Sequence, residues 1–435
     1  MIMEVPMKKI LFLVLLLILI FNTNVFALEI SSPNAILIDV ESGKILYEKD
    51  AYSEVYPAST TKILTAILAL ENCSLDEKVT ASYNAIMSVP YDGTTAAIQV
   101  GETWTVKQLV EAMMVCSANE AANMLAEHIG GSVESFASMM NSRAKEIGAK
   151  STYFVNPNGL HNSKHKTTTY DMAFIARHGM LNLPEFKRAS ALTNFSLPST
   201  SIYDKNDRNY INTNRMIVKS SSYYYKYATG IKTGFTSQAL NCIVSSAEKD
   251  GVELIAVVMG AMGTKNRTDD TITLFEYGFD KLKSEKFLAK GDIVENFTIT
   301  GAPTDKNTLI AAISQDVVHT IPSSKTAKDY APEINISKEL KAPITSGEIL
   351  GSIKYIIEDN TYEYDLIATN SVESVMNNVA ASVVSTTKVV GKVILWAIIT
   401  VIAMFIGLIL LRAAILTKKQ KVRRRRIMMY NSRFR

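Results

Sequence analysis

The feature that most constrains this chain is an apolar run at residues 393–411, which only Thr400 interrupts. At about 1.5 Å of rise per residue, a helix of this length spans about 30 Å, the thickness of the hydrocarbon core of a bilayer. Residues 412–435 contain ten lysine or arginine residues and no acidic residue. This flank argues against a buried core helix, and it predicts a transmembrane helix at 393–411 with a basic cytoplasmic tail at 412–435.

The amino terminus carries a second apolar run, shorter than the first. Lys8 and Lys9 precede an unbroken apolar stretch at 10–21, and residues 25–27 (VFA) place small side chains where a signal peptidase reads them. The pattern predicts a secretory signal peptide at 1–27 that is cleaved after Ala27; the alternative is an uncleaved signal anchor. In either case the body of the chain is exported.

The net charge follows this topology. The whole chain carries a formal charge of +4, but the tail contributes ten positive charges and residues 1–27 a net +1, which leaves −7 for the exported part. The basic residues therefore indicate membrane topology, and the tail could also contact the anionic lipid heads of the cell membrane. Nucleic-acid binding by the tail is the weaker alternative, and nucleic acid is not expected as a partner.

The number of cysteines limits the role that disulfides can have in the exported part. The chain has three cysteines, Cys73, Cys116 and Cys242, which are too few for a disulfide scaffold and leave at least one unpaired. We interpret Cys116 as a small buried residue and not as a catalytic thiol.

Hydrophobic periodicity divides the exported body into strands and helices. An early β-hairpin at 35–38 and 44–47, a helical middle and three late strand-like runs predict an α/β fold, in which an antiparallel sheet is assembled from both ends of the region and flanked by helices. The expected helices begin at Ser59, at 105, at 119 and after Ser132, with a closing helix at 271–279; the late strands are expected at 229–236, 241–246 and 254–259.

A change in the sequence pattern indicates a second domain. Short strand-like runs separated by Gly, Pro, Asp and Asn predict a small all-β domain after the first. The expected organisation is a signal peptide at 1–27, a catalytic domain at 28–284, a β-rich domain at 285–370, a juxtamembrane linker at 371–392, the transmembrane helix at 393–411 and the tail at 412–435.

One Ser-x-x-Lys motif is placed for nucleophilic chemistry. Ser59 and Lys62 lie one helical turn apart on the same face, directly after Pro57-Ala58 and at the start of an apolar helix. A serine hydroxyl is a weak nucleophile until a neighbour takes its proton, and a lysine with a lowered pKa can do so. The motif occurs five times in the chain, so the spacing alone is weak evidence.

Two further motifs supply polar and cationic groups. Ser117-Ala118-Asn119 lies between two expected helices, where a hydroxyl and an amide could relay a proton and hold a substrate amide. Lys232-Thr233-Gly234 lies on the first late strand, where a cation, a hydroxyl and a close-approaching backbone suit a substrate carboxylate. A Gly-x-Ser-x-Gly elbow is absent from the sequence, and His161 and His165 are interpreted as structural.

The order of the three motifs resembles the penicillin-recognising serine enzymes. The wider sequence is similar to the low-molecular-weight penicillin-binding proteins that act as serine-type D-Ala-D-Ala carboxypeptidases, over about residues 35–368. The stretches that carry this resemblance are 56–65 (YPASTTKILT), 154–160 (FVNPNGL), 170–173 (YDMA), 230–236 (GIKTGFT) and 341–344 (KAPI).

The resemblance implies a β-lactamase/transpeptidase-like fold and a set of roles. It makes Ser59 the acylated nucleophile and Lys62 its general base, with Ser117 and Asn119 completing the proton network. It implies peptidoglycan stem peptides as substrates, β-lactam antibiotics as covalent inhibitors, and no metal or cofactor. The expected substrate-binding residues are Lys232, Thr233 and Arg267 for the terminal carboxylate, with Gly234 beside them and the backbone N–H groups of Ser59 and Phe235 as the oxyanion hole.

Some positions depart from the family pattern. Ala118 and Glu120 stand where many members have Gly and Asp, and Ala239-Leu240 replaces a common Ala-Gly. These departures put substrate fit and rate in doubt. The alternatives are a β-lactamase of the same superfamily, although no Glu-x-x-x-Asn spacing occurs between Asn119 and Lys232, and a non-catalytic wall-binding protein. Transpeptidase and endopeptidase activities would use the same residues.

Overall fold

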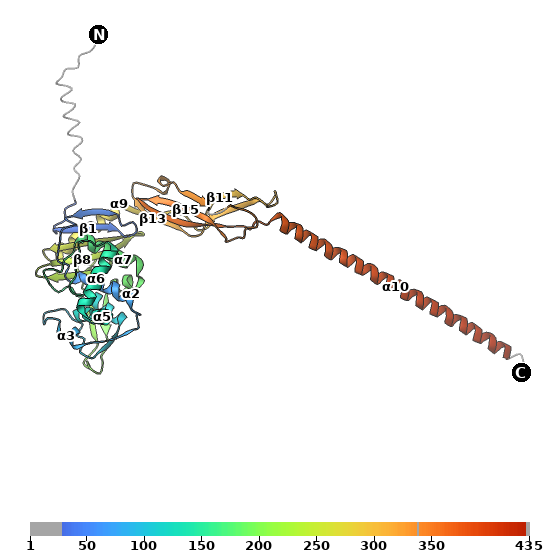
Figure 1. Cartoon of the computed structure of the whole chain (residues 1–435), viewed down its shortest axis with the longest axis horizontal. Helices are drawn as coiled ribbons and strands as arrows, with labels where there is room; N and C mark the ends of the chain where they lie inside the picture. Colours follow the sequence, from blue (N-terminus) through green and yellow to red (C-terminus); the bar gives the residue numbers. More distant parts are fainter. Residues whose placement is uncertain (1–27, 337–338, 432–435) are drawn as a thin grey trace, which may run out of the picture. The chain divides into compact units, whose positions relative to one another are not determined.

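A computed structural model of the chain describes residues 28–336 and 339–431 (Figure 1). The expected signal peptide at 1–27 therefore lies outside the described residues. The described chain forms two compact units. The first unit runs to Phe287 and also includes Val318–Ala331 and Ile356–Thr361, and the second contains the remainder.

A five-stranded antiparallel sheet forms the centre of the first unit, in the order β2-β1-β9-β8-β7. The chain thus brings its early hairpin beside its late strands, with Ile36 opposite Val257, as the hydrophobic pattern predicted. The strands are β1 Asn34–Asp39, β2 Ile45–Lys49, β7 Ala228–Thr236, β8 Leu240–Lys249 and β9 Val252–Ala261.

Helices cover both faces of this sheet. Successive side chains of a strand point to opposite faces, and in β1 Ile36 and Ile38 join one hydrophobic cluster while Ala35 and Leu37 join the other. Helix α9 packs on the second cluster and the remaining helices on the first (Figure 1). The helices are α2 Lys62–Asn72, α3 Tyr83–Met87, α4 Val106–Val115, α5 Asn119–Gly130, α6 Val133–Ile147, α7 Thr169–Asn182, α8 Pro184–Ser190 and α9 Thr264–Lys281.

Local signals explain most helix ends. Ser132 caps the start of α6, and Gly131 and Gly148 adopt positive φ where α5 and α6 end. The closing helix is an exception, since α9 begins at Thr264 and not at 271. Residues 264–270 have no apolar side chain, so hydrophobic periodicity could not detect this turn.

A second sheet forms the core of the β-rich region, in the order β11-β12-β16-β15-β14. This confirms the expected all-β domain, although the expected boundary at 284/285 falls inside strand β10. The strands of this sheet are β11 Ile293–Thr298, β12 Thr308–Ile313, β14 Glu333–Ile336, β15 Ile349–Ile357 and β16 Asn360–Ala368. Strands β10 Leu282–Leu288 and β13 Val317–Pro322 form a separate two-stranded sheet.

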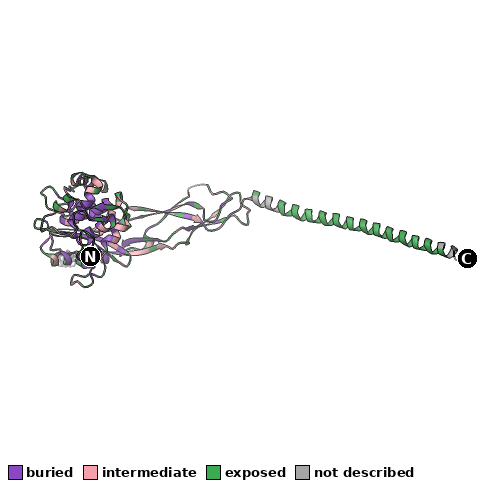
Figure 2. Cartoon of the chain, turned by 90° about the horizontal axis from the view of Figure 1, so that it is seen from below, coloured by how far each residue is buried: buried purple, intermediate pink, exposed green. Residues whose placement is uncertain are grey.

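One long helix, α10, runs from Val375 to Asn431. It includes a segment, Val383–Arg426, that is long and apolar enough to cross a membrane, and the side chains of this segment are exposed along its length (Figure 2). The helix passes through the regions expected as linker, transmembrane span and tail, and the linker is helical from Val375 onward.

Candidate active site

Ser59 lies in a single turn of 3₁₀ helix, η1 (Ala58–Thr61), which leads directly into α2. The two threonines after Ser59 stabilise this turn, because the Thr60 hydroxyl donates to the Pro57 carbonyl at 2.7 Å and the Thr61 hydroxyl to the Ala58 carbonyl at 2.8 Å. Ser59 thereby stands partly exposed at the amino end of an otherwise buried helix.

Lys62 is fully buried and its amine contacts three oxygens. Its Nζ lies 3.0 Å from the Ser59 hydroxyl and 2.7 Å from Asn119 Oδ1, and it also donates to the backbone carbonyl of Asn158. A neutral amine has two N–H groups, which suffice for Asn119 and Asn158 and leave its lone pair to face the Ser59 hydroxyl. Burial, together with the charge of Lys232, holds the pKa of Lys62 well below its ordinary value.

The second motif follows the end of α4. Ser117 adopts a φ of +64°, which turns the chain sharply so that Asn119 begins α5 and reaches Lys62. The Ser117 hydroxyl makes no hydrogen bond to any residue that the structure describes. The preceding Cys116 is buried, as predicted; its thiol donates to the Ala112 carbonyl, and burial raises its pKa to about 12.

Glu120 anchors a loop beside this motif. It is 1% exposed, and one of its carboxylate oxygens accepts hydrogen bonds from the backbone N–H of Ala96 at 2.6 Å and of Ile98 at 3.4 Å. Burial raises the pKa of this carboxyl. Glu120, one of the positions that depart from the family pattern, therefore has a structural contact in this chain.

The third motif lies on β7 and places a second buried lysine, Lys232, close enough for its charge to act on Lys62. Lys232 Nζ donates to the Thr233 carbonyl at 3.0 Å and to the Thr213 hydroxyl at 3.5 Å, and the Thr233 hydroxyl donates to that of Thr213 at 2.9 Å. Burial lowers the pKa of Lys232 to about 7, and the charge of Arg267 acts in the same direction. A carboxylate at this position would restore the ammonium form.

Gly234 allows β7 to approach the nucleophile. A Cβ at this position would lie 2.9 Å from the Ser59 backbone nitrogen, closer than Cβ atoms come to other atoms, and 3.1 Å from the Pro57 carbonyl oxygen, which is tighter than most such contacts. The backbone of Phe235 follows directly, while its side chain is largely exposed. The strand motif and the nucleophile turn are therefore in contact, as the motif order predicted.

Arg267 projects from the first turn of α9 and is 6% exposed. Its Nε is buried without a hydrogen-bond partner among the described residues, and burial lowers its pKa. An unpartnered buried guanidinium nitrogen near Lys232 is suited to an incoming anion.

Sequence reasoning missed two residues of this arrangement. Thr213 precedes the short helix η2 (Arg215–Ile217) and belongs to no motif, so only the fold brings it to Lys232. Asn158 lies in one of the stretches that resemble the family, but its contact is made by a backbone carbonyl, which leaves no residue-type signal.

The structural interpretation of His165 is confirmed. Its Nδ1 accepts from the backbone N–H of Val155 at 3.1 Å, so its Nε2 carries the proton and donates to the Thr61 hydroxyl at 2.8 Å. Burial lowers the pKa of this histidine to about 3, which keeps the imidazole neutral.

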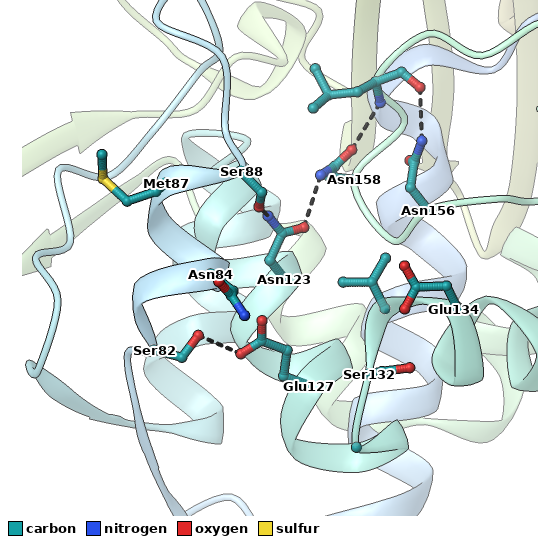
Figure 3. A pocket seen from close by; sticks show the side chains of 13 residues that line it. Ser82, Asn84, Met87, Ser88, Asn123, Glu127, Ser132, Glu134, Asn156 and Asn158 are labelled. Atoms are coloured by element: carbon teal, nitrogen blue, oxygen red, sulfur yellow. Dashed lines mark hydrogen bonds between the residues drawn. The ribbon is translucent and has the colours of Figure 1, made fainter.

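A pocket of about 750 Å³ is lined in part by the loop whose Asn158 carbonyl contacts Lys62 (Figure 3). The Asn158 side chain donates to Asn123 Oδ1 at 2.9 Å, and the Asn123 amide donates to Ser88 at 3.0 Å. The pocket wall is thus connected by hydrogen bonds to the residue whose carbonyl holds Lys62. The other lining residues are Ser82, Asn84, Met87, Glu127, Gly131, Ser132, Val133, Glu134, Asn156 and Leu160.

Comparison with known proteins decides the family. Residues 22–263 match the model of the D-alanyl-D-alanine carboxypeptidase family of peptidases, which is more than half of the chain. The chain belongs to this family. Residues 282–374 of this carboxypeptidase also match the C-terminal domain of penicillin-binding protein 5. The assignment confirms a serine-type D-Ala-D-Ala carboxypeptidase and favours it over the β-lactamase alternative.

Curated relatives and solved structures agree with this assignment. The carboxypeptidase is 30% identical to D-alanyl-D-alanine carboxypeptidase DacF of Bacillus subtilis, over 74% of this chain and 80% of the relative. The crystal structure of penicillin-binding protein 5 from Haemophilus influenzae matches with a TM-score of 0.58 and 27% identity, covering 80% of this chain and 98% of that one. PBP3 of Streptococcus pneumoniae matches with a TM-score of 0.65 and 26% identity, covering 79% and 100%.

Proposed function

We propose that this carboxypeptidase removes the terminal D-alanine of peptidoglycan pentapeptide stems through an ester on Ser59. The contact that supports this most directly is the buried Lys62 amine, 3.0 Å from the Ser59 hydroxyl. With its pKa lowered, Lys62 takes the hydroxyl proton as Ser59 Oγ attacks the carbonyl carbon of the penultimate D-alanine. Backbone N–H groups of Ser59 and Phe235 stabilise the resulting oxyanion.

The remaining site residues act before and after this step. Lys232, Thr233 and Arg267 bind the terminal carboxylate, and Gly234 lets the substrate strand lie against β7. When the tetrahedral intermediate collapses, the terminal D-alanine leaves with the proton that Lys62 holds. Asn119 keeps the Lys62 amine in place, and Ser117 relays the proton. Water then hydrolyses the ester and returns a proton to Ser59.

The same attack on a β-lactam ring would leave a penicilloyl ester on Ser59. We expect intact-mass analysis of the full chain to show one adduct after benzylpenicillin treatment and none in Ser59→Ala, which should also fail to release D-alanine from a pentapeptide. Ser142→Ala is a matched control, because Ser142 and Lys145 repeat the motif on the exposed face of α6. An adduct that turns over rapidly would favour a β-lactamase, and acylation without D-alanine release would favour a wall-binding protein.

We also infer that α10 anchors the enzyme in the cell membrane with its basic end in the cytoplasm. The apolar length of α10 and the arginine-rich residues 423–426 support this orientation. In intact spheroplasts, external protease should remove the catalytic region and spare an epitope at the carboxyl terminus. Loss of that epitope before lysis would reverse the topology.

A further inference from the structure

Three chemically different side chains that are distant in sequence converge at one place on the first unit. Cys73 caps the end of α2, Glu77 precedes strand β3 (Lys78–Thr80), and His128 lies in the last turn of α5. Their thiol, carboxylate and imidazole ligand atoms all lie within 4.8 Å of one another. His128 Nε2 and Glu77 Oε1 are 2.7 Å apart.

Backbone hydrogen bonds fix the positions of these residues before any ligand arrives. Cys73 N–H donates to the Ala69 carbonyl at 3.1 Å, Glu77 N–H donates to Ser74 at 3.2 Å, and the Glu77 carbonyl accepts from Val106 at 2.9 Å. Ser74 N–H also donates to the Glu77 carboxylate at 3.3 Å. The donors are therefore held on helix ends and a closed turn, which is the support that a metal site requires.

We propose that Cys73, Glu77 and His128 form a zinc site. Thiolate, imidazole and carboxylate are the three ligand types that Zn²⁺ takes from proteins, whereas Ca²⁺ and Mg²⁺ take oxygen ligands. At Zn–ligand distances of about 2.0–2.3 Å, tetrahedral donor atoms lie about 3.3–3.8 Å apart, so the present arrangement needs only small side-chain movements. Binding releases the thiol proton to solvent, and the thiolate and carboxylate charges balance the ion.

The position of the cluster suggests what the ion would do. Lys62 is the first residue of α2 and Asn119 the first of α5, while Cys73 and His128 lie at the opposite ends of the same two helices. With eleven residues at about 1.5 Å each, α2 is about 16 Å long. The zinc ion would therefore join the two helices that carry catalytic groups at the ends remote from the chemistry, and it would leave the acylation of Ser59 unchanged.

Cysteine exposure gives a selective test. Of the three cysteines, all within the described residues, Cys73 is partly exposed while Cys116 and Cys242 are buried. We expect micromolar Zn²⁺ to slow alkylation of Cys73 at least tenfold in the tag-free, metal-stripped full chain in detergent. Competition against a chelating dye should show one zinc ion per chain, and Cys73→Ser and His128→Ala should each weaken its affinity at least tenfold.

His178→Ala provides the matched control. His178 Nε2 and Glu71 Oε1 lie 3.0 Å apart, which reproduces the histidine–glutamate pair without a thiol, so this variant should keep the wild-type affinity. Stoichiometric penicillin labelling confirms that each variant is folded. If a variant fails that check, the thiolate-to-cobalt charge-transfer band of the Co²⁺-loaded wild type decides instead. Unprotected Cys73, equal affinity in all variants, or no such band would overturn the proposal.

Discussion

At the scale of single residues, the proposed mechanism uses two buried lysines that need opposite protonation states. In this proposal Lys62 has to be neutral to accept the Ser59 proton, and Lys232 has to be charged to bind a carboxylate. Burial disfavours the charged form of both, and the Lys232 charge further lowers the pKa of Lys62. The two requirements are met together only over a limited range of pH.

This conflict predicts a bell-shaped pH profile for acylation by benzylpenicillin. The second-order rate constant should rise as Lys62 loses its proton, and it should fall above about pH 7, where the free enzyme loses the Lys232 proton. In Lys232→Arg the guanidinium stays protonated, so the fall at high pH should disappear even if the maximum rate is lower. A wild-type rate that keeps rising to pH 9, or an unchanged fall in the variant, would contradict this assignment.

Gly234 supports a second prediction, which concerns space and not charge. In Gly234→Ala the new Cβ would collide with the backbone of Pro57 and Ser59, so β7 has to move away from the nucleophile. A displacement of about 1 Å in an active site typically costs about 100-fold in rate, and we expect that loss in penicillin acylation. Gly391→Ala on α10 meets nothing within 4 Å and should acylate at the wild-type rate. Equal rates for the two variants would show that the contact is unimportant.

At the scale of elements, helix α4 leads the chain into the Ser117 turn and begins with a capping box. The Thr105 hydroxyl accepts from Gln108 N–H at 3.2 Å, and Gln108 Oε1 accepts from Thr105 N–H at 3.0 Å. Thr105→Ala should cost about 1 kcal/mol, or about 2–4 °C in Tm, while Thr105→Ser should retain most of the stability. Differential scanning calorimetry measures both. An alanine variant as stable as the serine variant would show that the cap contributes little.

The elements also show how far sequence reasoning reaches. Strands β1, β2 and β7–β9 alternate or run apolar, and the three motifs mark positions that this sheet and its helices bring into contact, so the fold and most of the site could be predicted. The polar first turn of α9 could not be predicted, because it has no apolar side chain. The Thr213 hydroxyl and the Asn158 carbonyl could not, because they act through long-range contacts that leave no local pattern.

Helices α2 and α5 illustrate the difference between contacts that sequence spacing predicts and contacts that it does not. The Ser-x-x-Lys spacing of Ser59 and Lys62 correctly predicted contact between the two groups, but not that the hydroxyl stands in a 3₁₀ turn. Cys73 and His128, at the far ends of α2 and α5, are 55 positions apart in sequence, and no spacing rule for metal ligands joins them.

At the scale of the whole molecule, the chain combines a compact first unit, which contains the candidate active site, with a long helix. The membrane-length segment of that helix has exposed side chains. In water, the apolar residues of Val383–Arg426 would present a large unfavourable surface, which a lipid bilayer removes. The residues of the proposed mechanism all lie before residue 268, and the hydrogen bonds of Lys62 and Lys232 are made within the first unit. Anchoring and chemistry should therefore be separable by truncation.

A chain that ends at Ser374, just before α10, should test this separation. We expect it to move from the membrane to the soluble fraction and to keep the acylation rate of the full chain with benzylpenicillin, because the hydrogen bonds to Lys62 and Lys232 are retained. The full chain should resist extraction by high salt and alkaline carbonate, since its attachment is apolar, and should require detergent. Replacing the arginines at 423–426 by glutamine is the matched control for purely electrostatic attachment. Release of that variant by salt, or membrane retention of the truncated chain, would show that other parts of the protein hold it at the bilayer.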